Sequence, residues 1–108
     1  MLKGMLVSLP RRQGVGKLES ASGGRCSVSI FFSLVHTETS DVDAAELARA
    51  YLSPQTRAYV LDEGQIMVGR VTDYLLQDSG LMTYEVRLPN GKQKDFSEVD
   101  LFVRPWSA

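Results

Sequence analysis

The stretch Gly14-Val15-Gly16-Lys17-Leu18 is the part of this sequence that comes closest to a phosphate-binding loop. A loop of that kind has a longer glycine-rich spacing and ends in Gly-Lys-Ser/Thr, because backbone amides cradle the phosphates while the hydroxyl binds magnesium. Leu18 stands where the hydroxyl is needed. The stretch therefore favours a strand that starts at a glycine, and it does not predict nucleotide hydrolysis.

The other reactive side chains are too scattered to predict a catalytic centre. His36 is the only histidine, and no serine near it has the spacing of a nucleophile elbow. Cys26, the only cysteine, excludes an intramolecular disulfide and a cysteine-based zinc site, and its alternation with Val28 is typical of a core strand. The acidic clusters in 41–46 and 95–100 lack the glycine and dense alternation of a calcium loop. We expect no catalytic residues, no metal and no cofactor.

Basic and aromatic side chains are the remaining candidates for binding. The formal net charge of −1 argues against binding nucleic acid by bulk electrostatics, but it allows a local basic patch. An aromatic cage for a methylated lysine or arginine is disfavoured, because Tyr84 alternates with Met82 as a core residue does. Trp106 follows the last apolar segment and is the candidate for protein interaction. The candidates for a nucleic-acid surface are Arg11, Arg12, Lys17, Arg70, Lys92 and Lys94.

The elements that must position these residues are mostly short strands. Segments rich in Val, Ile, Leu, Phe and Tyr recur between Gly, Ser, Asn and Pro breaks, which is typical of strands joined by turns. The predicted strands are Leu6–Leu9, Val15–Ser20, Arg25–Ser33, Arg57–Leu61, Ile66–Tyr74, Met82–Leu88, Lys94–Phe96 and Leu101–Arg104.

The two halves of the chain show a weak internal repeat. Gly16-Lys17-Leu18 falls on Gly69-Arg70-Val71, and Leu6-Val7 falls on Tyr59-Val60. Further along, Val28-Ser29-Ile30-Phe31 falls on Tyr84-Glu85-Val86-Arg87, and Asp43-Ala44-Ala45-Glu46-Leu47 falls on Ser97-Glu98-Val99-Asp100-Leu101. This order predicts a mainly β protein made of two tandem five-stranded small barrels of the Tudor-like or KOW-like kind, at 1–54 and 55–108. Two unrelated hairpins remain the alternative explanation.

One short helix is predicted within Ser40–Leu52, in the first barrel. Ser40 and Asp43 are typical of a helix start, Val42, Leu47 and neighbouring apolar residues give part of an apolar stripe, and Pro54 ends it.

The second half resembles the N-terminal tandem Tudor-like region of RapA-type helicases, which are bacterial ATPases of the Swi/Snf class. The resemblance rests on Gly64–Val71, Gly80–Tyr84, Val86–Gly91 and Glu98–Arg104; the first half agrees more loosely through Gly14–Leu18, Ser29–Phe32 and Ser53–Val60. It implies an accessory part of a helicase-like ATPase that contacts RNA polymerase or the motor and regulates the ATPase. The alternative is a nucleic-acid-binding module that guides the motor to DNA or RNA.

The expected cellular location follows from the hydrophobicity of the sequence alone. No apolar run approaches the roughly 20 residues that span a bilayer, and Pro10 interrupts the N-terminal apolar stretch too early for a signal peptide. We expect a cytoplasmic protein without a membrane partner.

Overall fold

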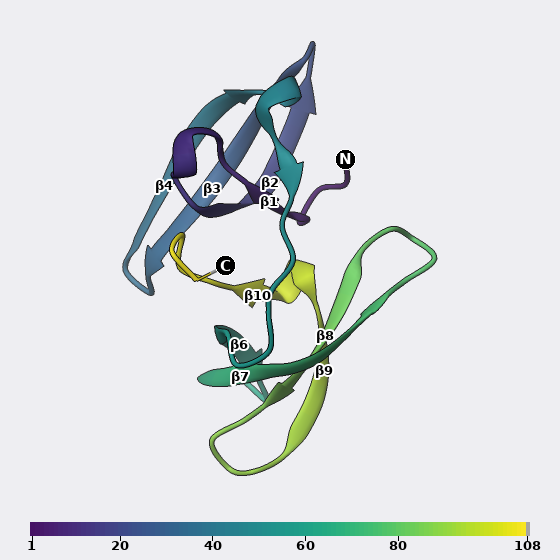
Figure 1. The fold of residues 1–108 in the computed structure, drawn as a ribbon. Helices are drawn as coiled ribbons and strands as arrows, with labels where there is room; N and C mark the ends of the chain where they lie inside the picture. Colours follow the sequence, from purple (N-terminus) through teal and green to yellow (C-terminus); the bar gives the residue numbers. More distant parts are fainter. Residues whose placement is uncertain (108) are drawn as a thin grey trace.

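The computed structural model describes residues 1–107, and it consists of two five-stranded antiparallel sheets (Figure 1). The first sheet has the strand order β4-β3-β2-β1-β5. Its elements are β1 (Leu6–Ser8), the 3-10 turn η1 (Pro10–Arg12), β2 (Val15–Ser22), β3 (Arg25–Ser33), β4 (His36–Asp43), the 3-10 turn η2 (Ala44–Glu46) and β5 (Ala48–Arg49).

The second sheet repeats the same plan, with the strand order β10-β6-β7-β8-β9. Its elements are β6 (Arg57–Asp62), β7 (Gln65–Leu76), β8 (Met82–Arg87), β9 (Gln93–Ser97), the 3-10 turn η3 (Glu98–Asp100) and β10 (Leu101–Phe102). Each strand of the first sheet, and the turn η2, has a counterpart at the same place in the second; η1 has none in the described part of the chain. The repeat in the order of strands predicted from sequence is therefore present in the structure.

A glycine occupies the same position in both sheets. Gly16 on β2 lies opposite Val7, and Gly69 on β7 lies opposite Ala58. A Cβ atom at Gly16 would come within 2.3 Å of a methyl group of Val28 on β3. A Cβ atom at Gly69 would come within 2.4 Å of a methyl group of Val86 on β8. Only glycine lets the neighbouring strand pack this closely at these two sites.

The register corrects part of the predicted alignment. Val7 and Ala58 are the residues that lie opposite the two glycines, so Val7 corresponds to Ala58 rather than to Val60. Val28 and Val86 likewise lie opposite the equivalent residues of β2 and β7, whereas the alignment matched Val28 to Tyr84. Both errors are two residues long, because a shift of two leaves the alternation of a strand unchanged.

The helix predicted within Ser40–Leu52 is wrong. The segment up to Asp43 belongs to β4, which pairs with β3 along most of its length, and only the single turn η2 follows it. Asp43 does act as a cap, since its carboxylate accepts a hydrogen bond from the Ala45 amide at 3.1 Å. The apolar stripe was too short to stabilise a longer helix, whereas the strand satisfies its backbone groups against β3.

Each sheet remains open rather than closing as a barrel. The strand order joins neither β4 to β5 nor β9 to β10 in residues 1–107. The second sheet is nevertheless curled, and this curvature lets the Lys94 ammonium on β9 reach the Asp62 carboxylate on β6 at 2.8 Å. This ion pair bridges strands that are not hydrogen-bonded neighbours.

The two halves share their hydrophobic core. The larger cluster combines Val60, Val71 and Tyr84 of the second half with Leu6 and Leu52 of the first. The main chain of Leu52 also contacts the second half, since its amide donates a hydrogen bond to the Tyr84 hydroxyl at 3.1 Å. The halves therefore form one packed unit. No helix in residues 1–107 is long and apolar enough to cross a membrane.

Candidate binding surfaces

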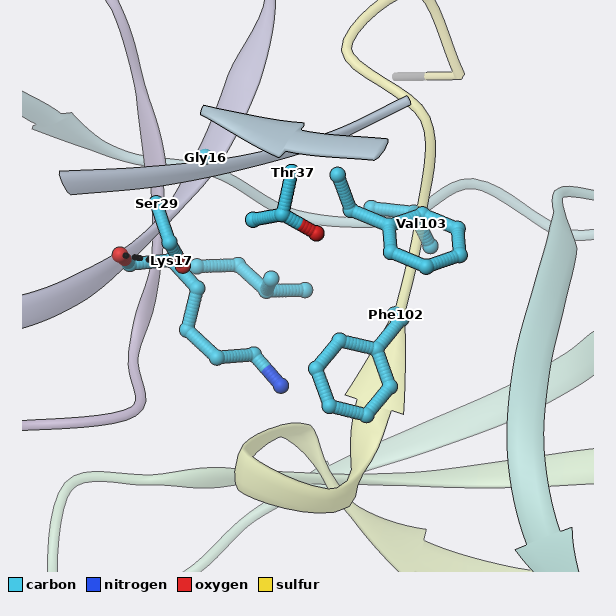
Figure 2. A pocket seen from close by; sticks show the side chains of 8 residues that line it. Gly16, Lys17, Ser29, Thr37, Phe102 and Val103 are labelled. Carbon is cyan, nitrogen blue, oxygen red and sulfur yellow. Dashed lines mark hydrogen bonds between the residues drawn. The ribbon is translucent and has the colours of Figure 1, made fainter. Parts of the chain in front are cut away.

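Lys17 extends from β2 of the first half into the second half. Its ammonium donates hydrogen bonds to the carbonyl oxygens of Val99, at 2.7 Å, and Leu101, and it lies 4.0 Å from the centre of the Phe102 ring. Figure 2 shows Lys17 pointing toward this ring beside a small cavity of about 30 Å³. Burial lowers the pKa of Lys17 to about 8, although nearby carboxylates, Asp100 first, act in the opposite direction.

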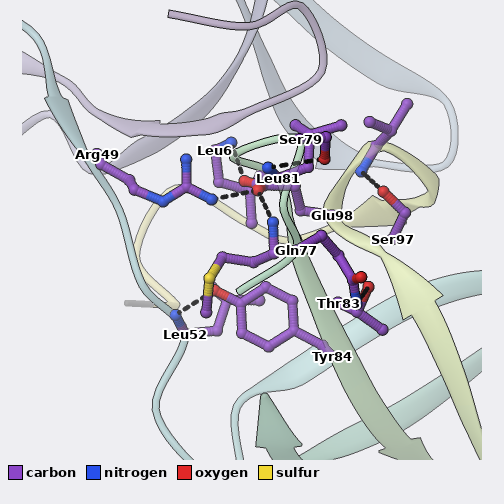
Figure 3. A network of polar contacts seen from close by, with 12 residues as sticks. Leu6, Arg49, Leu52, Gln77, Ser79, Leu81, Thr83, Tyr84, Ser97 and Glu98 are labelled. Atoms are coloured by element: carbon purple, nitrogen blue, oxygen red, sulfur yellow. Dashed lines mark hydrogen bonds and ion pairs between the residues drawn. The ribbon is translucent and has the colours of Figure 1, made fainter. Parts of the chain in front are cut away.

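Glu98 forms a second junction from the opposite side. Its side chain is fully buried at the start of η3, and its carboxylate accepts hydrogen bonds from the amides of Leu6, at 2.8 Å, and Met82. The same carboxylate forms an ion pair with the Arg49 guanidinium of β5 (Figure 3). A buried carboxylate is stable only when charge and hydrogen-bond partners surround it. Glu98 therefore fixes the position of the second half against both β1 and β5.

An apolar cleft lies beside Phe102 of the Lys17 junction, on the outer face of the second sheet. The tip of the β3–β4 hairpin covers one side of it, where the Phe31 ring packs 5.1 Å from the Tyr59 ring and 5.6 Å from the Phe102 ring. The cleft has a volume of about 260 Å³. This site is called the apolar cleft below, and its apolar lining consists of Phe31, Leu34, Tyr59, Val60, Leu61, Ile66 and Phe102.

Three arginines form a row across the same sheet. Arg57 on β6 lies directly opposite Arg70 on β7, which lies directly opposite Arg87 on β8. All three are exposed, and none forms an ion pair within residues 1–107. Directly opposed like charges destabilise a sheet, so this arginine row has a cost in the free protein.

A cleft at the end of the arginine row contains the only tryptophan. The side chains of Arg57, Tyr59, Arg104 and Trp106 line it, and its volume is about 300 Å³. The Arg104 guanidinium lies 5.4 Å from the centre of the Tyr59 ring and 5.9 Å from that of Trp106. Trp106 is nevertheless 68% exposed. On its other side, Trp106 lines a second cleft together with Arg12.

The structure does not bring the predicted nucleic-acid set together. Lys17 is buried and already bound to carbonyl groups, so it does not contribute to an exposed basic surface in this structure. Lys94 is engaged by Asp62, whose hydrogen bond is the main cause of the raised pKa of this lysine. Lys92 is exposed in the turn between β8 and β9. Arg11 and Arg12 are exposed in η1, at positive φ values of 59° and 58°.

The sequence interpretation missed the residues that do gather. Of the arginine row, only Arg70 was in the candidate set for nucleic acid, and neither Arg57 nor Arg87 was chosen. A usable signal existed for Arg57, because a two-residue turn at Glu63-Gly64 sets the β6–β7 register. No such signal existed for Arg87, since β7 carries a bulge between Val71 and Asp73.

Reactive side chains are few on these surfaces. His36 lies in β4, where its ring is 3.3 Å from Glu38 on an exposed edge, and Cys26 is buried in the first core. In residues 1–107, no three His, Cys, Asp or Glu side chains are grouped so that they could hold a metal ion. What the arrangement offers is binding by apolar contact and by guanidinium groups.

Comparison with known proteins adds no relative to this description. No protein-family model matches the chain, and no curated protein matches it.

Proposed function

We propose that the chain is a non-catalytic, Tudor-like accessory module of a helicase-like ATPase, which regulates the motor by docking on a protein. The resemblance of the sequence to RapA-type helicases supplies the class of partner, namely RNA polymerase or the adjoining motor. The observation that carries the docking role is the apolar cleft, which both halves build and which solvent reaches.

The exposure of the cleft is greater than the fold requires. Leu34, Leu61 and Ile66 are exposed by 59%, 62% and 57%, although each has a large apolar side chain. Single exposed apolar residues are ordinary, but contiguous ones mark interaction sites on soluble proteins. Leu61 and Ile66 lie directly opposite each other on β6 and β7, so they form one continuous surface.

The base of the cleft is already ordered. Phe31 packs against the rings of Tyr59 and Phe102, and the Arg104 side chain donates a hydrogen bond to the Phe32 carbonyl at 3.2 Å. These contacts hold the β3–β4 hairpin on the second sheet. A partner that enters a preformed cleft loses less binding energy to ordering of the receptor.

A matched pair of double variants tests this function. Leu61→Thr/Ile66→Thr removes apolar surface inside the cleft, while Leu75→Thr/Leu76→Thr makes a comparable change at exposed positions on β7 outside it. Binding is measured by biolayer interferometry with bacterial RNA polymerase core enzyme and, separately, with a RapA-type motor polypeptide. Burying one such side chain contributes about 1.5–3 kcal/mol, so the cleft variant should bind its partner at least about tenfold more weakly.

Two binding results would contradict the proposal. If the wild-type chain binds neither protein, or if both double variants lose the same affinity, the cleft is not the docking surface. A second readout follows the ATPase rate of the motor, which should change when the wild-type chain is added and not when the cleft variant is added.

The alternative function, guiding a motor to DNA or RNA, loses the basis given to it by sequence. Lys17 and Lys94 are engaged within the protein, so the predicted set supplies no common basic face. A nucleic-acid role requires a different set of side chains.

A further inference from the structure

We propose that the arginine row and Trp106 form a binding site for single-stranded nucleic acid, beyond the docking role of the apolar cleft. The row places three guanidinium groups on one face, and none of them has a carboxylate partner within residues 1–107. A single guanidinium group can bind two phosphate oxygens through two parallel hydrogen bonds. A phosphate backbone would relieve the repulsion that the opposed arginines create in the free protein.

The row continues beyond β6 on the side of β10. β10 pairs Phe102 with Tyr59, so extending this register by two residues brings Arg104 opposite Arg57. Both arginines line the same cleft. Neighbouring strands lie about 4.8 Å apart, so the main-chain distance across the sheet from Arg57 to Arg87, two strands away, is about 10 Å. Four arginines thus form a continuous basic track across the sheet.

Trp106 gives this track the feature that selects nucleic acid over other anions. Its indole is 68% exposed and lies between the cleft of Arg57 and the cleft of Arg12. An unpaired base stacks on an exposed aromatic ring, whereas an acidic peptide has no need of one. Because a base in a duplex is already stacked, the site favours single strands.

An acidic row sets the limit of the site. Asp73, Glu85 and Asp95 lie directly opposite one another on β7, β8 and β9, on the same face as the arginine row and next to it. Phosphates are repelled there. The phosphate backbone of the bound strand must therefore leave the arginine row in the direction of Arg104, Trp106 and Arg12. This path brings the bases to the Trp106 ring.

The experiment uses fluorescein-labelled oligothymidylate and fluorescence anisotropy across a salt titration. Arg57→Gln/Arg70→Gln removes two charges from the row, and Lys3→Gln/Arg25→Gln removes two exposed charges elsewhere. The row variant should bind about tenfold more weakly or worse, and its log–log salt slope should fall by about 1.4, since each lost phosphate contact is worth about 0.7. The control should bind as the wild type does.

Trp106 supplies an independent readout, because it is the only tryptophan in the chain. Binding should quench its fluorescence, and Trp106→Leu should weaken binding about fivefold or more. Thermal unfolding of the row variant should occur at or above the wild-type temperature, since opposed charges have been removed.

Four outcomes overturn the proposal. They are no binding of oligothymidylate at low salt, equal losses in the row variant and the charge control, equally tight binding of a duplex without quenching of Trp106, and displacement of the oligonucleotide by polyglutamate at equal charge. The last would assign the arginines to an acidic protein segment.

Discussion

Raising the pH from 7 to 9.5 should stabilise this protein, because Lys17 is buried as a charged group. Burial lowers the pKa of Lys17 in the folded state to about 8, while the unfolded value is 10.5. Below pH 8 both states carry the proton, so the lysine adds no pH dependence. Between the two values the unfolded state binds more protons, and the free energy of unfolding therefore rises with pH.

The size of this effect follows from the two pKa values. Each pH unit between them contributes up to about 1.4 kcal/mol, and the full interval corresponds to about 3 kcal/mol. By pH 9.5 the gain should be about 2 kcal/mol. Above pH 10 two other groups act in the opposite direction, because burial raises the pKa of Tyr84 and the hydrogen bond to Asp62 raises that of Lys94. Stability contributed by those two groups is lost as pH rises through their folded pKa values.

Urea unfolding of the wild type and of Lys17→Met measures the prediction. Methionine is unbranched and one heavy atom shorter than lysine, and it carries no charge, so the difference between the two proteins cancels the titration of other groups. The wild type should gain stability relative to Lys17→Met between pH 7 and 9.5. A difference that stays constant over this range would refute the burial of a charged ammonium between the halves.

Other predictions concern the contacts that join the two sheets, each measured as the free energy of unfolding in urea. Glu98→Ala should cost about 3–5 kcal/mol, because it leaves the partly buried Arg49 guanidinium and two backbone amides without their partner; a loss below 1 kcal/mol would contradict the network drawn in Figure 3. Gly69→Ala should cost about 1–3 kcal/mol, since its Cβ would meet the Val86 methyl group. A neutral result would show that β8 can move away. Tyr84→Phe should cost about 1–3 kcal/mol by leaving the Leu52 amide unsatisfied, unless water replaces the hydroxyl.

Strands with an apolar face could be predicted from sequence, and strands without one could not. The segments around Val28, Val71 and Val86 alternate clearly, and they became β3, β7 and β8. β4 contains Thr, Glu, Ser and Asp, and Val42 is its only buried residue. An edge strand of this composition has little apolar periodicity, so its pairing with β3 is evident only in the folded chain.

The polar junctions could not be predicted because their partners are distant in sequence. Lys17 binds the carbonyl of Val99, and Glu98 binds the amide of Leu6. Judged from its neighbours in the sequence, each of these two charged residues would lie in an exposed strand or turn. The position equivalent to Lys17 in the second half is Arg70, which is exposed. The repeat thus places two basic residues at matching sites with different roles.

Amide hydrogen exchange of the chain with and without its protein partner tests the docking role most directly. When RNA polymerase core enzyme or the RapA-type motor is added, the turns at 34–35 and 63–64 should gain protection, because both border the apolar cleft. The turn at 77–81, at the far end of the β7–β8 hairpin, should exchange as before. Unchanged exchange at 34–35 and 63–64 with both proteins, or protection confined to 77–81, would contradict docking through the cleft.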